Sequence, residues 1–502
     1  MNRMKNQTLA ILLLTAALYS TSLASCGDSS TEQTTDTTAV DVTTQEMTET
    51  EDSMLHDNLP DDLDFSGAQI SILARGNDDS YLEIDAENDG DVVNDAIYTR
   101  NLSVEERLNV DLIPIRGEGW QTYGNDLTKL RASVNSGSNA YQIVAGFGQS
   151  ISSLALENVF CDLTQYDYLD LEQVWWNQST VESMRICDAL YFVTGDIGLI
   201  TSLGGSYVLF ANDVIMNNYD IANLAEMVHN GTWTIDAMLT ETAKVYHDLD
   251  GNGVMDDMDL YGFVIDHRVY ADYFAIGAGI RQITLTEDNI PQYTPQLDKM
   301  TTLLDKITPI FGENSASVGA IMLNKGNGGG RHYEMFPEGK AMIISAELSF
   351  ATTEAYRNAE DGYTILPYPK MDETQERYYV NGSNGASLWG IPTDVTTPEI
   401  SAAVLEAMAC ASYNYVTPAY FETCLQTKMA RNEDTIAMLN IIRDGCYVDA
   451  EYLYKGLFSE TCHTAQKILS GKKGAASWYE SNQKKIDKSV EKAIQSFKDL
   501  QS

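Results

Sequence analysis

The stretch 125–149, NDLTKLRASVNSGSNAYQIVAGFGQ, contains one complete unit of the pattern that decides the fold. Its first half places Leu127, Leu130 and Val134 three and four residues apart, which is the spacing of one face of an amphipathic helix. Its second half contains the apolar run 143–145, which predicts a short buried strand that ends at a glycine-containing segment. A helix that leads directly into a buried strand is typical of an α/β protein.

The same alternation of strand and helix precedes this stretch. Residues 69–73 alternate between apolar and polar side chains and predict a strand. Apolar residues then recur at helical spacing over 91–109, and 110–113 predicts a second strand that stops at Pro114. Strands that alternate with helices predict a parallel sheet with helices on its faces.

The rest of the chain is richer in helices. Short strands are predicted at 207–210, 341–344 and 363–366. Thr397 followed by Pro398 predicts a helix start, because proline is well suited to the first helical position. Apolar residues spaced four, four and three apart over 486–497 predict an amphipathic helix at the C-terminal end.

The N-terminal residues 1–25 are typical of a secretory signal peptide. Two basic residues precede the apolar run 10–19, which is too short to span a bilayer comfortably. The segment 23–26, Leu-Ala-Ser-Cys, resembles the lipobox of bacterial lipoproteins, which implies cleavage before Cys26 and acyl chains, palmitate among them, on that residue. The alternative is an ordinary signal peptide with a chance cysteine. The resemblance implies a protein anchored by lipid to the extracellular face of the bacterial cell membrane.

Composition constrains the part of the chain beyond the anchor. Residues 26–62 are acidic and rich in threonine, with few aliphatic side chains, and predict a disordered linker. About 440 residues remain, which exceeds the size of a usual single core and predicts two lobes. A formal net charge of −41 would repel phosphate groups and excludes nucleic acid as an expected partner. Six cysteines remain besides Cys26, and whether they form disulfides stays open.

Four segments carry a resemblance to a known family. They are, in chain order, YVLFAN at 207–212, NGTWT at 230–234, FPEGKAM at 336–342 and LWGIP at 388–392. Together with the lipobox, their order makes the chain resemble the bacterial extracellular solute-binding lipoproteins of ABC transporters, family 1, which include the sugar-binding proteins.

The resemblance implies a two-lobed, periplasmic-binding-protein-like (type II) α/β fold with a hinge and a cleft between the lobes. The first lobe is expected at 63–206 plus 378–430, and the second at 207–377 plus 431–502. The implied function is not enzymatic: a small solute, with an oligosaccharide preferred, is captured and passed to an ABC permease in the membrane. A surface-anchored glycan-acting enzyme and an adhesive lipoprotein remain as alternatives. The motifs HExxH and GxSxG do not occur, and no catalytic residue is predicted.

The loop 248–259, DLDGNGVMDDMD, resembles a calcium-binding loop of the EF-hand type. Oxygen-bearing side chains stand at positions one, three and five, and glycine at position six permits the sharp turn. Position twelve is aspartate, as in the calcium loops of dockerins, where the EF-hand has glutamate. A solvated acidic turn is the alternative to a structural Ca²⁺ site. The predicted ligands are Asp248, Asp250, Asn252, Val254 through its carbonyl, Asp256 and Asp259.

Candidate ligand-binding residues follow predicted strand ends or offer aromatic rings. Open α/β sheets bind ligands at the carboxyl ends of their strands, and sugars need aromatic platforms beside hydrogen-bonding groups. For the polar candidates the alternative is a solvated surface, and for the adjacent tryptophans it is packing in the core. The candidates are Arg75, Gln149, Trp175, Trp176, Glu347 and Asn384.

Overall fold

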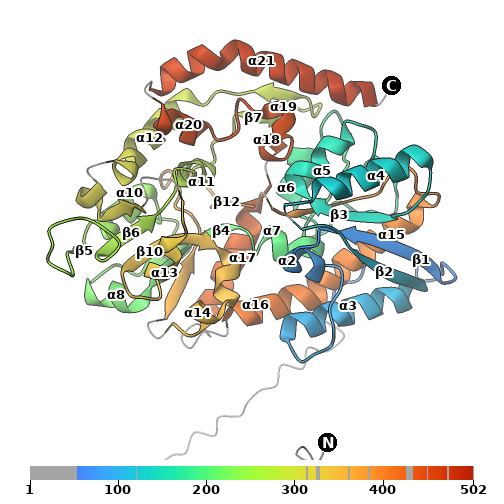
Figure 1. Ribbon diagram of the computed structural model, residues 1–502, viewed down its shortest axis with the longest axis horizontal. Helices are drawn as coiled ribbons and strands as arrows, with labels where there is room; N and C mark the ends of the chain where they lie inside the picture. The colour runs from blue at the N-terminus through green and yellow to red at the C-terminus, as the bar shows by residue number, and fades with distance from the viewer. Residues whose placement is uncertain are drawn as a thin grey trace, which may run out of the picture. The chain divides into compact units, whose positions relative to one another are not determined.

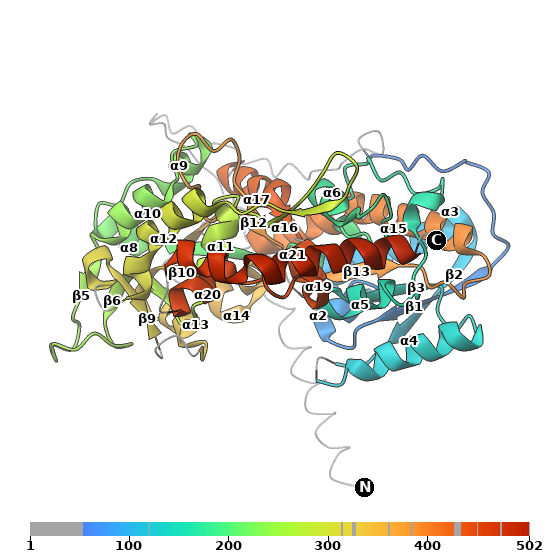
Figure 2. The same ribbon diagram turned by 90° about the horizontal axis from the view of Figure 1, so that it is seen from above.

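The computed structural model describes residues 54–119, 121–312, 315–323, 328–359, 362–382, 385–425, 433–448, 450–471 and 474–500 (Figures 1 and 2). The predicted signal peptide, Cys26 and Asn384 lie outside the described residues. No helix in the described ranges has the length and apolar character needed to cross a membrane. The cysteines whose side chains are described are free thiols, and they are Cys161, Cys187, Cys410, Cys446 and Cys462.

Residues 54–62 differ from the predicted linker, because they pack against the folded part. Leu59 is buried, and Arg107 donates to the Asp57 carboxylate over 3.1 Å. Contacts group all residues from Met54 to Ser502 into one unit. The linker prediction over 26–62 is therefore wrong for its last nine residues, which a buried leucine and an ion pair fix in place.

The first sheet is built as the strand–helix alternation predicts. Three parallel strands lie side by side, and a fourth, β13, joins them antiparallel. The intervening helices are α3 (Val92–Leu108), α4 (Gly124–Ser136) and α5 (Gly148–Ala155). The strand order is β13 (Ser387–Gly390), β3 (Ile143–Phe147), β1 (Ala68–Ala74) and β2 (Val110–Arg116).

The second sheet is mixed and has six strands. Strand β10 pairs parallel with β6 and antiparallel with β4, so β10 and β6 present their carboxyl ends at one edge. The helices that accompany this sheet include α10 (Ile235–Thr242), α11 (Tyr270–Gly277) and α12 (Leu297–Phe311). The strand order is β11 (Tyr363–Leu366), β4 (Tyr207–Asn212), β10 (Ala341–Glu347), β6 (Leu260–Ile265) and β5 (Tyr246–His247), and β9 (Ala320–Met322) pairs with β6.

Short segments connect the two sheets. The chain passes from α7 (Leu199–Ser202) into β4, and it returns to the first sheet through β12 (Val380–Asn381). Strand β12 pairs parallel with β14 (Cys446–Tyr447), which lies 66 residues later at both paired positions. The other helices are α2 (Asp78–Leu82), α6 (Gln178–Met184), α8 (Asp213–Asn218), α9 (Leu224–His229), α13 (Arg331–Met335), α14 (Glu354–Arg357), α15 (Pro398–Ala411), α16 (Thr417–Leu425), α17 (Glu433–Gly445), α18 (Ala450–Leu453), α19 (Lys455–Phe458) and α20 (Thr464–Ser470).

The helix α21 (Ala475–Leu500) runs past both sheets (Figures 1 and 2). Its first turns place Tyr479 in the hydrophobic cluster of the second sheet. Its later turns place Ile486 and Phe497 in the cluster of the first sheet. The packing therefore does not follow the predicted lobe boundary, which put all of 431–502 in the second lobe.

Candidate functional site

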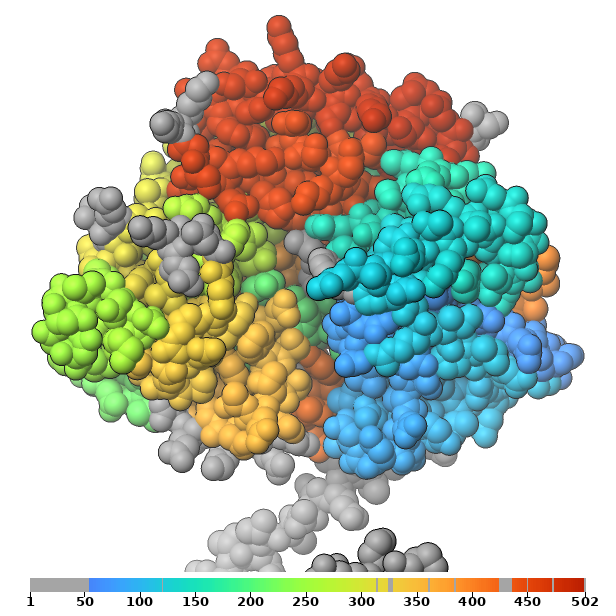
Figure 3. Space-filling model, viewed as in Figure 1, coloured from blue at the N-terminus to red at the C-terminus, as the bar shows by residue number. Residues whose placement is uncertain are grey.

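A cavity of about 380 Å³ lies between the two sheets. In the space-filling view the surface is hollowed between the blue side and the yellow-to-orange side (Figure 3). Its volume is within the range of small-molecule sites. The lining residues come from the segment after β1 and from α2 (Arg75, Asn77, Asp79), from the second sheet, the segment after β10 and α11 (Tyr207, Glu347, Ser349, Tyr273), and from the connecting segments (Ile200, Thr201, Gly205, Asn381, Gly385).

Arg75 reaches the cavity because it directly follows β1, whose carboxyl end lies beside those of β2 and β3. Its side chain is only about 5% exposed. The guanidinium Nε and Nη2 donate to the Ser80 hydroxyl over 3.0 and 2.6 Å, and its carbon lies 5.2 Å from the centre of the Phe147 ring. These contacts hold a cation in a defined place at the cavity wall.

Glu347 reaches the cavity from the opposite sheet, as the last residue of β10. It pairs in the antiparallel register with Tyr207, the first residue of β4. Burial raises the pKa of the Glu347 carboxyl. A hydrogen bond with the Tyr207 side chain counteracts this shift, and the negative charge of Asp79 adds to it. Two carboxyl groups from opposite sides of the cavity are therefore close enough to influence each other.

Tyrosine rings form an aromatic wall beside Glu347. The rings of Tyr207 and Tyr273 stack with their centres 4.3 Å apart and their planes 26° apart. Tyr270 packs edge-on against both rings, at 6.1 Å from Tyr207 and 5.6 Å from Tyr273. Burial raises the pKa of each of these three tyrosines, so their hydroxyl groups stay neutral.

A buried network fixes the connecting segment at the base of the cavity. Glu83 accepts hydrogen bonds from the Thr201 backbone N–H and hydroxyl, over 2.7 and 2.8 Å. The Thr201 hydroxyl in turn accepts from the Ser387 backbone N–H over 2.7 Å. Burial raises the pKa of Glu83 to about 7. The network joins the end of α2, the connecting helix α7 and strand β13, so it positions the Thr201 side of the cavity.

The tryptophan pair does not form a platform in this cavity. Trp175 and Trp176 are each about 1% exposed, and neither lines the cavity that contains Arg75 and Glu347. Their indole N–H groups donate to the Glu406 carboxyl over 3.1 and 2.9 Å. A buried carboxyl on α15 therefore satisfies both indoles, and the two tryptophans line a separate cavity of about 370 Å³ together with Arg377 and Arg443.

Among the predicted ligand residues that the structure describes, two come together at the cavity between the sheets. Arg75 and Glu347 line one cavity, whereas Gln149 lies half-buried in the first turn of α5 and is not among the lining residues. The tyrosines of the wall were missed as site residues. Tyr207 opens a segment that the sequence marks as a connection between lobes, but Tyr273 lies in α11, where every residue is buried and the sequence pattern indicates only core.

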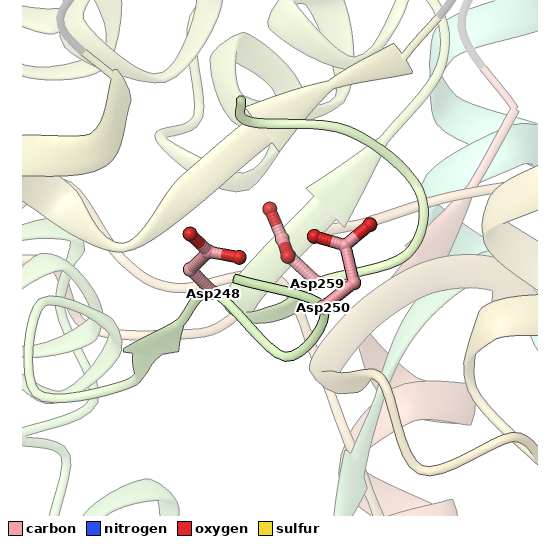
Figure 4. A group of neighbouring side chains, drawn as sticks. All are labelled: Asp248, Asp250 and Asp259. Atoms are coloured by element: carbon pink, nitrogen blue, oxygen red, sulfur yellow. The ribbon is translucent and has the colours of Figure 1, made fainter. Parts of the chain in front are cut away.

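The predicted calcium loop brings three carboxylates together between β5 and β6. One carboxylate oxygen from each of Asp248, Asp250 and Asp259 lies within 4.8 Å of the others (Figure 4). The Asp248 carboxylate accepts from the backbone N–H groups of Gly251 and Gly253 over 2.7 and 2.9 Å. Both glycines have positive φ, near 71° and 72°, which favours glycine at these two positions.

Val254 and Asp256 lie on the far arm of the same loop. Asn252 donates to Asp250 over 2.8 Å and accepts from the Val254 backbone N–H over 2.6 Å. Asp259 is fully buried and accepts from the Leu249 backbone N–H over 3.1 Å, which closes the loop. Of the six predicted ligands, three therefore have their carboxylates grouped in the structure, namely Asp248, Asp250 and Asp259.

The sequence, compared with protein-family models and with curated proteins, gives no match. Solved structures do match in fold, over most of the chain. A cyclo/maltodextrin-binding protein in complex with maltotetraose is 11% identical, with a TM-score of 0.54 over 86% of this chain and 98% of the other. The GacH receptor of Streptomyces glaucescens, solved unliganded and with acarbose, is 12% identical, with a TM-score of 0.51 over 84% and 99%.

A third similar structure is the galacto-N-biose-/lacto-N-biose I-binding protein of an ABC transporter from Bifidobacterium longum, in complex with lacto-N-biose. It is 13% identical, with a TM-score of 0.52 over 87% of this chain and 98% of the other. These neighbours are binding proteins, and two of the three are described with a bound saccharide. At such low identity the likeness establishes the fold, and it confirms the expected two-lobed α/β architecture.

Proposed function

We propose that this protein binds a small hydroxyl-rich solute, an oligosaccharide, in the cavity between its two sheets and delivers it to an ABC importer. The observation that carries the proposal is the convergence of Arg75 and Glu347, from the strand ends of different sheets, on one cavity with a stacked tyrosine pair. Carboxyl ends of strands are where open α/β sheets bind ligands. Two of the similar structures are saccharide-binding proteins, one of them from an ABC transporter, which supports the same function.

The cavity offers each kind of group that saccharide recognition needs. The Glu347 carboxyl accepts hydrogen bonds from hydroxyl groups, and the Arg75 guanidinium donates them. The face of a tyrosine ring packs against the apolar face of a sugar ring. The Ser349 hydroxyl and the Asn381 amide supply further hydrogen-bonding partners along the wall.

A thermal-shift screen over neutral and charged saccharides, with short peptides as the comparison set, tests this function. We expect at least one saccharide to raise the melting temperature, because a ligand that binds only the folded state stabilises it. Titration calorimetry of that saccharide should give one site per chain. Stabilisation by peptides alone would contradict the saccharide assignment, and no stabilisation by any small molecule would favour an adhesive lipoprotein.

A glycan-acting enzyme is the second candidate, because Asp79 and Glu347 place two carboxyl groups at the same cavity. Glycoside hydrolysis uses a pair of carboxyl groups, one of them with a raised pKa. Chromatography of a bound oligosaccharide after prolonged incubation separates the two functions. A binding protein returns the oligosaccharide intact, whereas shorter products would favour the enzyme.

The proposed location rests on the N-terminal sequence. Acyl chains on Cys26 would hold the protein at the extracellular face of the cell membrane, within reach of its permease. Labelled palmitate should enter the full-length protein and should not enter Cys26→Ala. Equal labelling of both would contradict the lipobox.

We also propose that the loop 248–259 binds one structural Ca²⁺ ion. Calcium takes six to eight oxygen ligands, and carboxylates, amide oxygens and backbone carbonyls are the types it prefers. The three carboxylates that converge in the loop repel one another without a cation, and a divalent ion would offset that repulsion. The ion would stabilise the connection between β5 and β6 and would not contact the solute.

A further inference from the structure

The side chains that line the cavity carry more negative than positive charges. The charged side chains are Arg75, Asp79 and Glu347, one cation and two carboxylates. The Arg75 guanidinium lies 3.8 Å from the carboxylate of Asp79 in α2, and the Ser80 hydroxyl accepts from the same guanidinium. Among the described residues, Glu347 has no ion-pair partner within 4 Å, so the carboxylate on the second-sheet side faces the cavity without a protein cation.

Glu347 lies beside two tyrosine rings that line the same cavity, and its carboxyl group forms a hydrogen bond with the Tyr207 side chain. Its β-sheet partner Tyr207 stacks on Tyr273 at 4.3 Å, and both rings line the cavity. The face of an aromatic ring carries negative potential and attracts an ammonium group within about 6 Å of its centre. A carboxylate beside stacked tyrosines therefore combines the two features that bind a cationic nitrogen.

The electrostatics of the free protein point in the same direction. Burial and the charge of Asp79 raise the pKa of Glu347, which means that the empty cavity disfavours the ionised carboxylate. A neutral solute would not reduce the free energy needed to ionise Glu347 in the cavity. A cationic group bound next to Glu347 would offset that free energy and would favour the ionised carboxylate.

We infer that the solute carries a protonated amine, which binds between the Glu347 carboxylate and the Tyr207–Tyr273 rings, so that the substrate class is an amino sugar with a free amine. This inference rests on the proposed saccharide-binding function. The Ser349 hydroxyl and the Asn381 amide also line the cavity and can bind hydroxyl groups of the same solute. Asp79, on the opposite wall, pairs with Arg75, so the lining keeps one net negative charge when Glu347 is ionised.

Three disaccharides of matched linkage test the inference by titration calorimetry. They are the β-1,4-linked disaccharide of glucosamine, its N-acetylated form, and cellobiose, which has a hydroxyl group in place of each amine. We expect the amine form to bind at least about tenfold more tightly than cellobiose, the difference that an ion pair of about 1.4 kcal/mol produces. The preference should shrink as the pH is lowered, because protonation of Glu347 removes the charge that the amine pairs with.

Substitutions at Glu347 test whether this side chain produces the preference for the amine. Glu347→Gln should weaken the binding of the amine form more than that of cellobiose, so that most of the preference for the amine is lost, whereas Glu347→Asp keeps the charge and should keep part of the preference. Glu354→Gln, on the exposed surface of α14, is the matched control for the loss of one charge and should leave all three affinities unchanged. The comparison of the three sugars on the unaltered protein does not depend on any variant folding.

The outcomes separate the inference from the proposed function. If cellobiose or the N-acetylated sugar binds as tightly as the amine, or Glu347→Gln weakens all sugars alike, the inference is wrong and the saccharide function stands. If the three sugars and the wider saccharide screen all fail to bind, the inference and the proposed function fall together.

Discussion

At the residue scale, Glu406 shows how one buried carboxyl group changes the role of its neighbours. It accepts from both indoles of the tryptophan pair and from the Asp170 backbone N–H, over 3.1, 2.9 and 3.2 Å. Burial raises the pKa of Glu406 to about 8, and the hydrogen bonds only partly counteract that shift. The carboxyl group is 230 residues from Trp176 in sequence, so no local pattern could reveal that these rings are satisfied in the core.

The variant Glu406→Gln should destabilise the protein by about 1–3 kcal/mol, because an amide cannot accept from all the donors and leaves a buried one unsatisfied. The same variant should also change how the free energy of unfolding depends on pH. The folded protein holds the Glu406 proton up to a pKa of about 8, whereas the ordinary value is 4.5. The stability that this group contributes is therefore fully present below about pH 4.5 and lost as the pH rises through about 8.

Urea unfolding at a series of pH values measures both effects. The unaltered protein should lose stability over that window more steeply than Glu406→Gln. Glu399→Gln, on the exposed face of the same helix, should keep the original slope. Equal slopes for Glu406→Gln and the unaltered protein would contradict the raised pKa.

At the element scale, the sequence predicted regular elements well wherever local pattern decides them. Helix α15 begins at Pro398 after Thr397, as expected, and the apolar spacing over 486–497 lies within α21. The sequence could point to Arg75 and Glu347 as residues of one cavity because side chains at strand ends gather at the carboxyl edge of a sheet. The pairing of β12 with β14 and the stack of Tyr207 on Tyr273 depend on contacts between distant segments, which periodicity does not encode.

The calcium loop is an element whose function a single side chain can test. Asp250→Ala should weaken calcium binding at least tenfold in titration calorimetry and should remove most of the rise in melting temperature that calcium gives over EDTA, because it deletes one of three converging carboxylates. Asp305→Ala, exposed on α12, is the charge-matched control. A loop that shows no calcium heat in the unaltered protein would refute the site.

A substitution in helix α21 can test whether its C-terminal end packs against the first sheet. Phe497 is fully buried against Tyr191 and Tyr454, with ring centres at 6.3 and 5.2 Å. Phe497→Ala should therefore cost about 3–5 kcal/mol of unfolding free energy, since it leaves a cavity in the first-sheet cluster. The adjacent exposed Lys498→Ala should change stability by less than about 0.5 kcal/mol. Similar small effects of both changes would mean that the end of α21 does not pack as described.

At the scale of the whole molecule, two sheets are linked by more than the connecting segments beside the cavity. Helix α21 packs on the hydrophobic clusters of both sheets. The hairpin of β7 (Ile283–Leu285) and β8 (Pro291–Tyr293) adds a second link, because Asn289 at its tip accepts from the Cys187 backbone N–H and donates to Asp188, over 2.8 and 2.7 Å. Any change in the separation of the sheets must therefore rearrange these contacts as well as the segments at the base of the cavity.

The central claim is that a solute binds in the cavity between the two sheets. A crystal structure of the protein with the tightest-binding saccharide of the screen tests it most directly. The account predicts saccharide density in contact with Arg75, Glu347 and the Tyr207–Tyr273 rings. Saccharide density at any other surface, with that cavity holding none, would contradict it.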